Sequence, residues 1–166
     1  MQMQITRHDQ PLDTIGTPPA VGTQLPQFDL KNAAGETVTS AQLLGKRTLI
    51  SVVPDIETRV CSIQTKHFNQ AVDQFEDVHF YTISTNTIEQ QNNWCAAEGV
   101  KNMQLLSDEA LSFGKAMQLY VPSNNTLQRS IFILEADGTI SYTELIIEQT
   151  DEPDYAAALN FLKAAQ

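Results

Sequence analysis

The stretch VPDIETRVCSIQTKHFNQAVDQF, residues 53–75, joins a predicted buried strand to a predicted amphipathic helix. The run TLISVV at 48–53 is continuous, apolar and β-branched, which is typical of a strand buried on both faces. Pro54 ends that strand, because proline has no backbone N–H to donate to a neighbouring strand. The helix begins near residues 58–60 and carries one stripe at helical spacing: Cys61, Thr65, Phe68, Val72 and Phe75.

The same alternation continues along the chain and predicts the fold class. After the first strand and helix, the expected elements are a strand at 78–84, a helix at 87–98, a strand at 103–106, a helix at 110–119, a hairpin at 130–134 and 139–146, and a helix after Pro153. The first part demands parallel crossovers, whereas the end supplies antiparallel strands. We therefore expect one α/β domain over residues 1–166, with a central mixed sheet flanked by helices.

The N-terminal quarter is expected to hold short elements. Residues 1–15 form a predicted β-hairpin extension with strands at 5–7 and 12–14, and a loop rich in proline and glycine follows. Two short strands at 28–31 and 36–39 and one helical turn at 41–44, capped by Ser40, lead into the first buried strand.

Composition and charge exclude several classes of protein. The chain has 166 residues and a net charge of -10, from 20 acidic and 10 basic side chains, so nucleic acid and anionic membranes are not expected partners. It has no stretch of 18 apolar residues and no apolar N-terminal signal segment. We therefore expect a cytoplasmic protein, in which thiols are kept reduced.

The two cysteines, Cys61 and Cys95, are either buried apolar residues or working thiols. Their spacing is not C-x-x-C, and two cysteines with three scattered histidines do not make a zinc site, so we expect no metal and no cofactor. Cys61 lies in the first turn of its helix, where free N–H groups and the helix dipole favour an anion such as a thiolate. The hydroxyl of Thr58, three residues earlier, can reach the sulfur or a bound oxygen.

Pro54, Thr58 and Cys61 together form the pattern P-x-x-x-[TS]-x-x-C, which resembles the signature of the peroxiredoxins. The block PDIETRVCSIQTKHFN is similar to the active-site block of bacterial thiol peroxidases, the atypical two-cysteine branch of that family. NWCAAEGVKN, around Cys95, resembles the resolving-cysteine segment of that branch, and the resemblance extends over essentially the whole chain.

The resemblance implies a thioredoxin-like fold and a thiol-dependent peroxidase that acts on organic hydroperoxides and hydrogen peroxide. It implies that Cys61 attacks the peroxide and becomes a sulfenic acid, which Cys95 resolves as an intramolecular disulfide that thioredoxin reduces. It also implies a homodimer. Pro54 is expected to shield the site and Thr58 to hydrogen-bond the thiolate or peroxide. Arg129 opens the predicted strand at 130–134 and is expected to stabilise charge there.

Two alternatives use the same cysteines: a thiol–disulfide oxidoreductase and a non-enzymatic redox sensor. Asp55, Arg59 and Gln64 are expected to affect the rate and the peroxide preference. The charges of Asp55 and Arg59 either offset each other near the thiol or, as we expect, both face solvent. The helix at 87–98 has few large apolar residues, so we expect it to unravel or shift when the disulfide forms.

Overall fold

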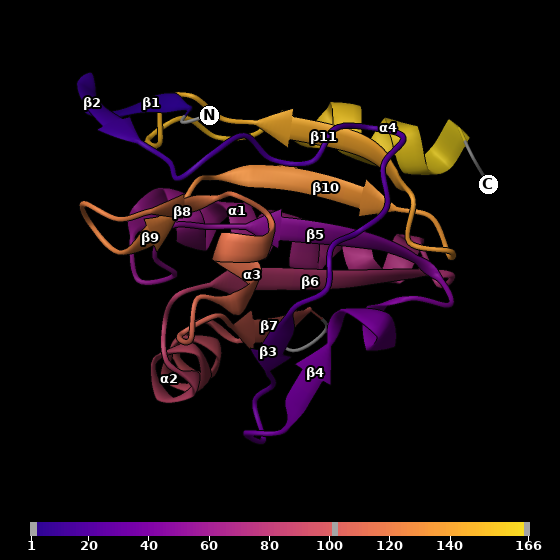
Figure 1. Cartoon of the computed structure of the whole chain (residues 1–166). Coiled ribbons are helices and arrows are strands. Elements are labelled where there is room, and N and C mark those ends of the chain that lie inside the picture. Colours follow the sequence, from indigo (N-terminus) through magenta and orange to yellow (C-terminus); the bar gives the residue numbers. More distant parts are fainter. Residues whose placement is uncertain (1–2, 101–102, 165–166) are drawn as a thin grey trace.

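The structure is a computed structural model that describes residues 3–100 and 103–164. Its centre is a seven-stranded sheet in the order β11-β10-β5-β6-β7-β3-β4 (Figure 1). The three inner strands are parallel: β5 (Arg47–Val52), β6 (Val78–Ser84) and β7 (Gln104–Ser107). The outer strands run antiparallel: β10 (Ser130–Leu134), β11 (Ile140–Leu145), β3 (Asp29–Lys31) and β4 (Thr37–Thr39). The predicted mixed α/β sheet is confirmed.

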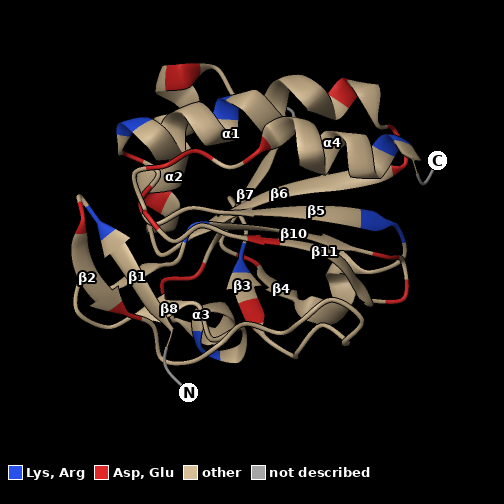
Figure 2. Ribbon diagram, turned by 90° about the horizontal axis from the view of Figure 1, so that it is seen from above, with Lys and Arg blue, Asp and Glu red and all other residues tan. Residues whose placement is uncertain are grey.

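Helices cover both faces of this sheet, as Figure 2 shows for α1 and α4 on one side and α3 on the other. Their bounds are α1 (Arg59–Ala71), α2 (Ile88–Glu98), α3 (Ser112–Ala116) and α4 (Tyr155–Ala164). Successive strand residues point to opposite faces, so Leu49 joins the core beneath α1 and α4 while Ile50 joins the core beneath α3. Both faces of the inner strands are therefore buried, which explains their continuous apolar sequences.

The N-terminal hairpin is also confirmed, with β1 at Gln4–Arg7 and β2 at Gln10–Asp13. His8 and Asp9 connect the strands with positive φ angles of 51° and 63°, as a two-residue type I′ turn requires. The hairpin is tied to the segment after β11 by two backbone bonds, from Thr6 N to Ile147 O (2.8 Å) and from Gln149 N to Thr6 O (2.7 Å). These bonds bring the hairpin to the end of the sheet where β5 finishes.

Two local predictions were wrong, and one small hairpin was not predicted. The predicted helix at 110–119 is only the five-residue α3, because Leu111 and Gln118 both adopt left-handed conformations (φ 66° and 60°). The short segment after it forms a small hairpin that the sequence analysis missed, β8 (Tyr120–Val121) and β9 (Thr126–Leu127). The turn after β4 is the 3₁₀ helix η1 (Ser40–Leu43), capped by Thr39 rather than Ser40.

Helix α1 also ends earlier than its apolar stripe suggests. It stops at Ala71 and passes into the 3₁₀ helix η2 (Val72–Gln74), so the stripe continues through a tighter turn to Phe75. Phe75 is still buried against the same core as Phe68. The predicted burial of the stripe holds for both phenylalanines, although the backbone there is no longer α-helical.

Candidate active site

The turn between β5 and α1 places Cys61 at the end of the sheet. Val53 makes the last parallel rung, donating its N–H to Ile83 O (3.0 Å), and Pro54 then ends the ladder. Thr58 is the N-cap of α1, and both its N–H and its hydroxyl donate to Asp55 O, at 3.0 and 2.8 Å. Cys61 is therefore the third residue of the helix, within the turn whose N–H groups lack helical partners.

The sulfur of Cys61 is fully buried and receives two hydrogen bonds. The backbone N–H of Asp55 donates to Sγ at 3.5 Å, and Nη2 of Arg129 donates to it at 3.4 Å. Both donors point at the sulfur, and the Arg129 contact brings a full positive charge to it. The structure thus places Arg129 beside the thiol, as the resemblance implied.

Arg129 is held by two glutamines: Gln64, which was expected from the sequence to affect the rate, and Gln149, which was not singled out. Its Nε and Nη2 donate to Gln149 O at 3.0 and 2.8 Å, and its Nη1 donates to Gln64 Oε1 at 2.8 Å. Gln64 in turn donates to Ser51 Oγ at 2.7 Å. Gln64 lies three residues after Cys61 on the same helix face, but nothing in the sequence indicated that it would contact Arg129. No feature of the sequence pointed to Gln149.

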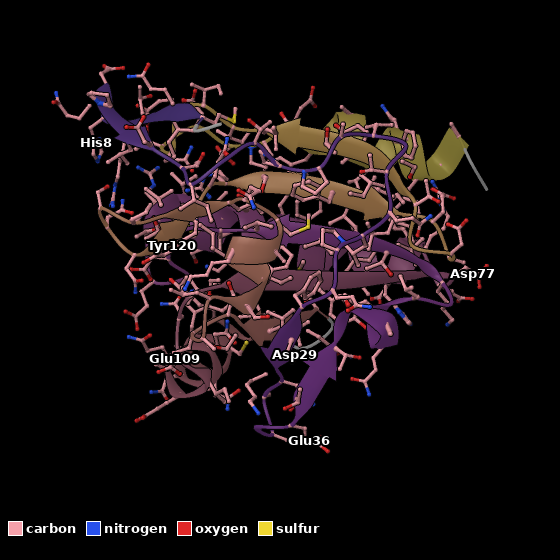
Figure 3. All side chains as sticks on the ribbon, viewed as in Figure 1. His8, Asp29, Glu36, Asp77, Glu109 and Tyr120 are labelled. Carbon is pink, nitrogen blue, oxygen red and sulfur yellow. The ribbon has the colours of Figure 1, made fainter. Side chains whose placement is uncertain are left out.

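A pocket of about 300 Å³ opens beside this buried thiol. Its lining comes from the hairpin tip, the turn before α1, the β8–β9 loop and the segment after β11, and includes Pro54, Thr58 and Arg129. Figure 3 labels His8, at the hairpin tip, and Tyr120, in β8, at the same end of the molecule. Thr58 donates its hydroxyl proton to Asp55 O and not to the sulfur, so toward the pocket this oxygen is an acceptor.

Cys95 lies on α2, on the same side of the sheet as Cys61. It is half-buried and packs against the core cluster that contains Cys61, and burial raises the pKa of its thiol. Both cysteines are free thiols in this structure. The predicted capping box of α2 is present, with Thr87 and Gln90 exchanging side-chain bonds, and Gly99 ends the helix in a left-handed conformation.

Asp55 and Arg59 were both expected to face solvent. Arg59 is exposed, but Asp55 is half-buried, and its carboxylate accepts from Asn86 Nδ2 (2.9 Å) and Glu57 N (3.0 Å). Asn86 also accepts from Ile56 N at 2.8 Å, so it joins the turn before α1 to the residues that precede α2. Asp55 therefore presents its N–H, and not its carboxylate, to the sulfur.

Neither a metal site nor a membrane-spanning helix is found in residues 3–100 and 103–164. No three His, Cys, Asp or Glu side chains in this part of the chain gather as metal ligands would. None of the helices described there is both long and apolar enough to cross a bilayer.

Comparison with known proteins agrees with this arrangement. The profile of the AhpC/TSA family matches residues 21–143. The chain is 41% identical to a thiol peroxidase of Listeria innocua, over 98% of this chain and 99% of that one, and 36% identical to a thiol peroxidase of Bacillus subtilis, over 97% of both.

Solved structures show the same fold at lower identity. A peroxiredoxin-like protein from Aquifex aeolicus superposes with a TM-score of 0.92 at 22% identity, over 99% of both chains. A thiol peroxidase from Chromobacterium violaceum gives 0.89 at 18% identity, over 98% of this chain and 97% of that one. The full-length relatives and the matching profile together show that this chain belongs to the AhpC/TSA family, in its thiol peroxidase branch.

Proposed function

We propose that this protein reduces hydroperoxides with Cys61 as the attacking thiolate and Cys95 as the thiol that resolves it. Thiol-dependent peroxide reduction is the activity of the family to which the chain belongs. The observation that carries the assignment to Cys61 is its buried sulfur, which accepts from Arg129 and from Asp55 N beside a pocket. Cys95 has no comparable donors among its described contacts.

In the first step the Cys61 thiolate attacks the distal oxygen of the hydroperoxide. The O–O bond breaks, the distal oxygen and its hydrogen become a sulfenic acid on Cys61, and the alkoxide leaves and takes up a proton to give the alcohol. Arg129 stabilises the thiolate before attack and the charge on the leaving oxygen during it. The Thr58 oxygen can accept the hydrogen of the bound hydroperoxide, which orients it for attack.

In the second step the thiol of Cys95 condenses with the sulfenic acid to form a disulfide and release water. Helix α2 is poorly anchored, since Trp94 is its only buried large apolar side chain, and this supports a shift of the helix that brings the two sulfurs together. A dithiol protein such as thioredoxin would then reduce the disulfide by exchange. We also propose that the working form is a homodimer.

The burial of Cys61 argues against the alternative of a protein disulfide reductase. Cys61 has no exposed surface, so any substrate must approach it through a small opening of the adjoining pocket of about 300 Å³. A hydroperoxide is small enough to enter this way, whereas a disulfide carried by another folded protein is not. A redox sensor would use the same first step but would not sustain turnover. Repeated peroxide consumption in the presence of thioredoxin and thioredoxin reductase would identify a peroxidase, and its absence would identify a redox sensor.

The test is the intact mass of the reduced protein after one equivalent of cumene hydroperoxide. The wild type should lose two hydrogens, Cys95→Ser should gain one oxygen, and Cys61→Ser should keep its mass. An unchanged wild-type mass would show that both cysteines are core residues and would contradict the proposal. Sedimentation of the reduced protein tests the dimer separately.

A further inference from the structure

Three of the four arginines in this strongly acidic chain line one pocket: Arg7, Arg59 and Arg129. The fourth, Arg47, is paired with Glu135 at the far end of β5 (3.3 Å). Figure 2 shows basic residues on the hairpin and on the first turn of α1, at the same end of the molecule. This concentration of positive charge contrasts with a net charge of -10 over the whole chain.

Within residues 3–100 and 103–164, Arg129 is the one pocket arginine that other side chains and carbonyls hold in place. Arg129 is buried, and its N–H groups donate hydrogen bonds to Gln64, Gln149 and Cys61. Arg7 and Arg59 are exposed. The ion pairs formed within the described residues are Arg47–Glu135 and Lys66–Glu98, so both exposed guanidinium groups at the pocket are without an anionic partner.

The acidic side chains near the pocket are held by other donors. Asp55 accepts from Asn86 and from Glu57 N. Glu148, next to the lining, accepts from the hydroxyl and amide of Thr150, from the Thr6 hydroxyl and from the amides of His8 and Asp9. These hydrogen bonds, led by that of the Thr150 hydroxyl, lower the pKa of Glu148 to about 2, so it stays charged and fixed to the hairpin.

The pocket has a buried end and an exposed end. Pro54 and Arg129 are buried and lie toward Cys61, while Arg7 and Arg59 are exposed and therefore mark the mouth. The lining of the pocket as a whole is mostly apolar and includes Val60. A ligand that fits this order has a hydroperoxide at its inner end, an apolar body, and an anion at its outer end.

We propose that Arg7 and Arg59 make the pocket selective for organic hydroperoxides that carry a carboxylate. Guanidinium groups bind carboxylates through paired N–H donors, which suits an anion held between the hairpin and the first turn of α1. The inference rests on the proposed peroxidase function and adds the substrate class. It also gives Arg59 a role, because the residue is exposed and contributes nothing to the core.

The test compares cumene hydroperoxide with its 4-carboxylate, 4-(2-hydroperoxypropan-2-yl)benzoate, which differs only by the anion. The measured quantity is the second-order rate constant for oxidation of the reduced protein. We expect the wild type to prefer the carboxylate about tenfold, and Arg7→Gln and Arg59→Gln each to lower that ratio about threefold, as expected for partly screened charge-assisted bonds. Lys163→Gln, which removes an exposed positive charge from α4, should leave the ratio unchanged.

The ratio separates the substrate class from the reaction itself. Any general effect of Arg59 on the thiolate changes both rate constants equally and cancels in the ratio. Increasing the salt concentration should lower the wild-type preference and weaken competitive inhibition by 4-isopropylbenzoate, a readout that needs no variant to fold. A wild-type ratio near one, or a ratio unchanged in Arg7→Gln/Arg59→Gln, would overturn the inference while leaving the peroxidase intact. No oxidation by either probe would instead overturn the proposed function, and this inference with it.

Discussion

Helix α1 buries five of its thirteen side chains, Cys61, Gln64, Thr65, Phe68 and Ala71, whereas α2 buries two of eleven, Gln91 and Trp94. The first helix holds its cysteine in the core beside an arginine, and the second holds its cysteine half-exposed at the edge of the same core. The difference supports the proposed roles, in which Cys61 attacks from a fixed position among its donors and Cys95 resolves from a helix that needs little free energy to move.

The polar contacts of the two helices support the same roles. Gln64 on α1 connects Ser51 to Arg129, and so lies in a network that orients the group facing the sulfur. Gln91 on α2 bonds Ser84 and Leu106 O, which fastens the first half of that helix to the sheet. Cys95 lies one turn beyond this anchor, so the second half of α2 can loosen while the first half stays in place.

Removal of each thiol in turn should give the largest contrast. Cys61→Ser should abolish peroxide consumption, a loss of about 10⁴-fold or more, because the nucleophile itself is gone. Cys95→Ser should keep the rate of the first oxidation within about twofold and lose only repeated turnover with thioredoxin, since resolution follows the attack. Stopped-flow oxidation and a steady-state coupled assay measure the two steps; equal loss of the first step in both variants would contradict the proposed roles.

The second largest effect on the rate of oxidation is expected on removal of the Arg129 guanidinium beside Cys61. Arg129→Met should slow the first oxidation about 10²- to 10³-fold, since it removes a preorganised donor from the reacting centre. Arg47→Met is the matched control. Arg47 is the first residue of β5, as Arg129 directly precedes β10, and its removal leaves the site untouched. If both variants slowed oxidation equally, the effect would be structural.

The strand, turn and helix that position Cys61 could be predicted because the information for them is local. Pro54, Thr58 and Cys61 lie within eight residues, and the runs at β5 and β6 are apolar enough to identify buried strands. The support for Arg129 could not be found in this way. Gln64 is 65 positions from it and Gln149 is 20, and only the folded sheet brings them together.

The wrong predictions for residues 110–119 and for Asp55 also arose from contacts and backbone conformations that the local sequence does not show. The helix expected at 110–119 fails because Asp108, just outside it, accepts from Phe113 N and Gly114 N and so fixes where α3 begins. Leu111 then takes a left-handed conformation that leucine seldom adopts and that no sequence pattern announces. The burial of Asp55 was missed because its partner, Asn86, is 31 residues away.

Truncating the largest buried apolar side chain of α1 and of α2 tests whether α2 can unfold locally while the rest of the protein stays folded. Phe68→Ala should lower the global free energy of unfolding by about 3–5 kcal/mol, since Phe68 is fully buried in the central core. Trp94→Ala should cost less globally, about 2 kcal/mol, and act mainly on α2. Denaturant unfolding gives the global values and hydrogen exchange the local ones; a loss of protection in β5 and β6 as large as that in α2 would contradict independent opening.

Disulfide formation should reproduce part of the Trp94→Ala effect without a mutation. We expect amide exchange in the second half of α2 to become about tenfold faster in the oxidised protein, while α1 beyond its first turn stays protected. Cys95→Ser exposed to the same peroxide is the control, because its Cys61 is oxidised without a disulfide. Unchanged protection of α2 in the oxidised wild type would mean that Cys95 reaches Cys61 without loosening its helix.

The smallest effect concerns the pH dependence of α2. Burial raises the pKa of the Cys95 thiol, so the closed helix binds the proton more tightly than the open one. The stability that this gives α2 is present below the ordinary thiol pKa and is lost as the pH rises through the raised pKa. Because the thiol is half-exposed, opening should increase by only about threefold over that range. Exchange rates in α2, corrected for intrinsic pH dependence, should show this rise in the wild type and not in Cys95→Ser, whose hydroxyl does not titrate there. The same rise in both would assign it to another group and leave only the difference in anchoring to distinguish the two cysteine helices.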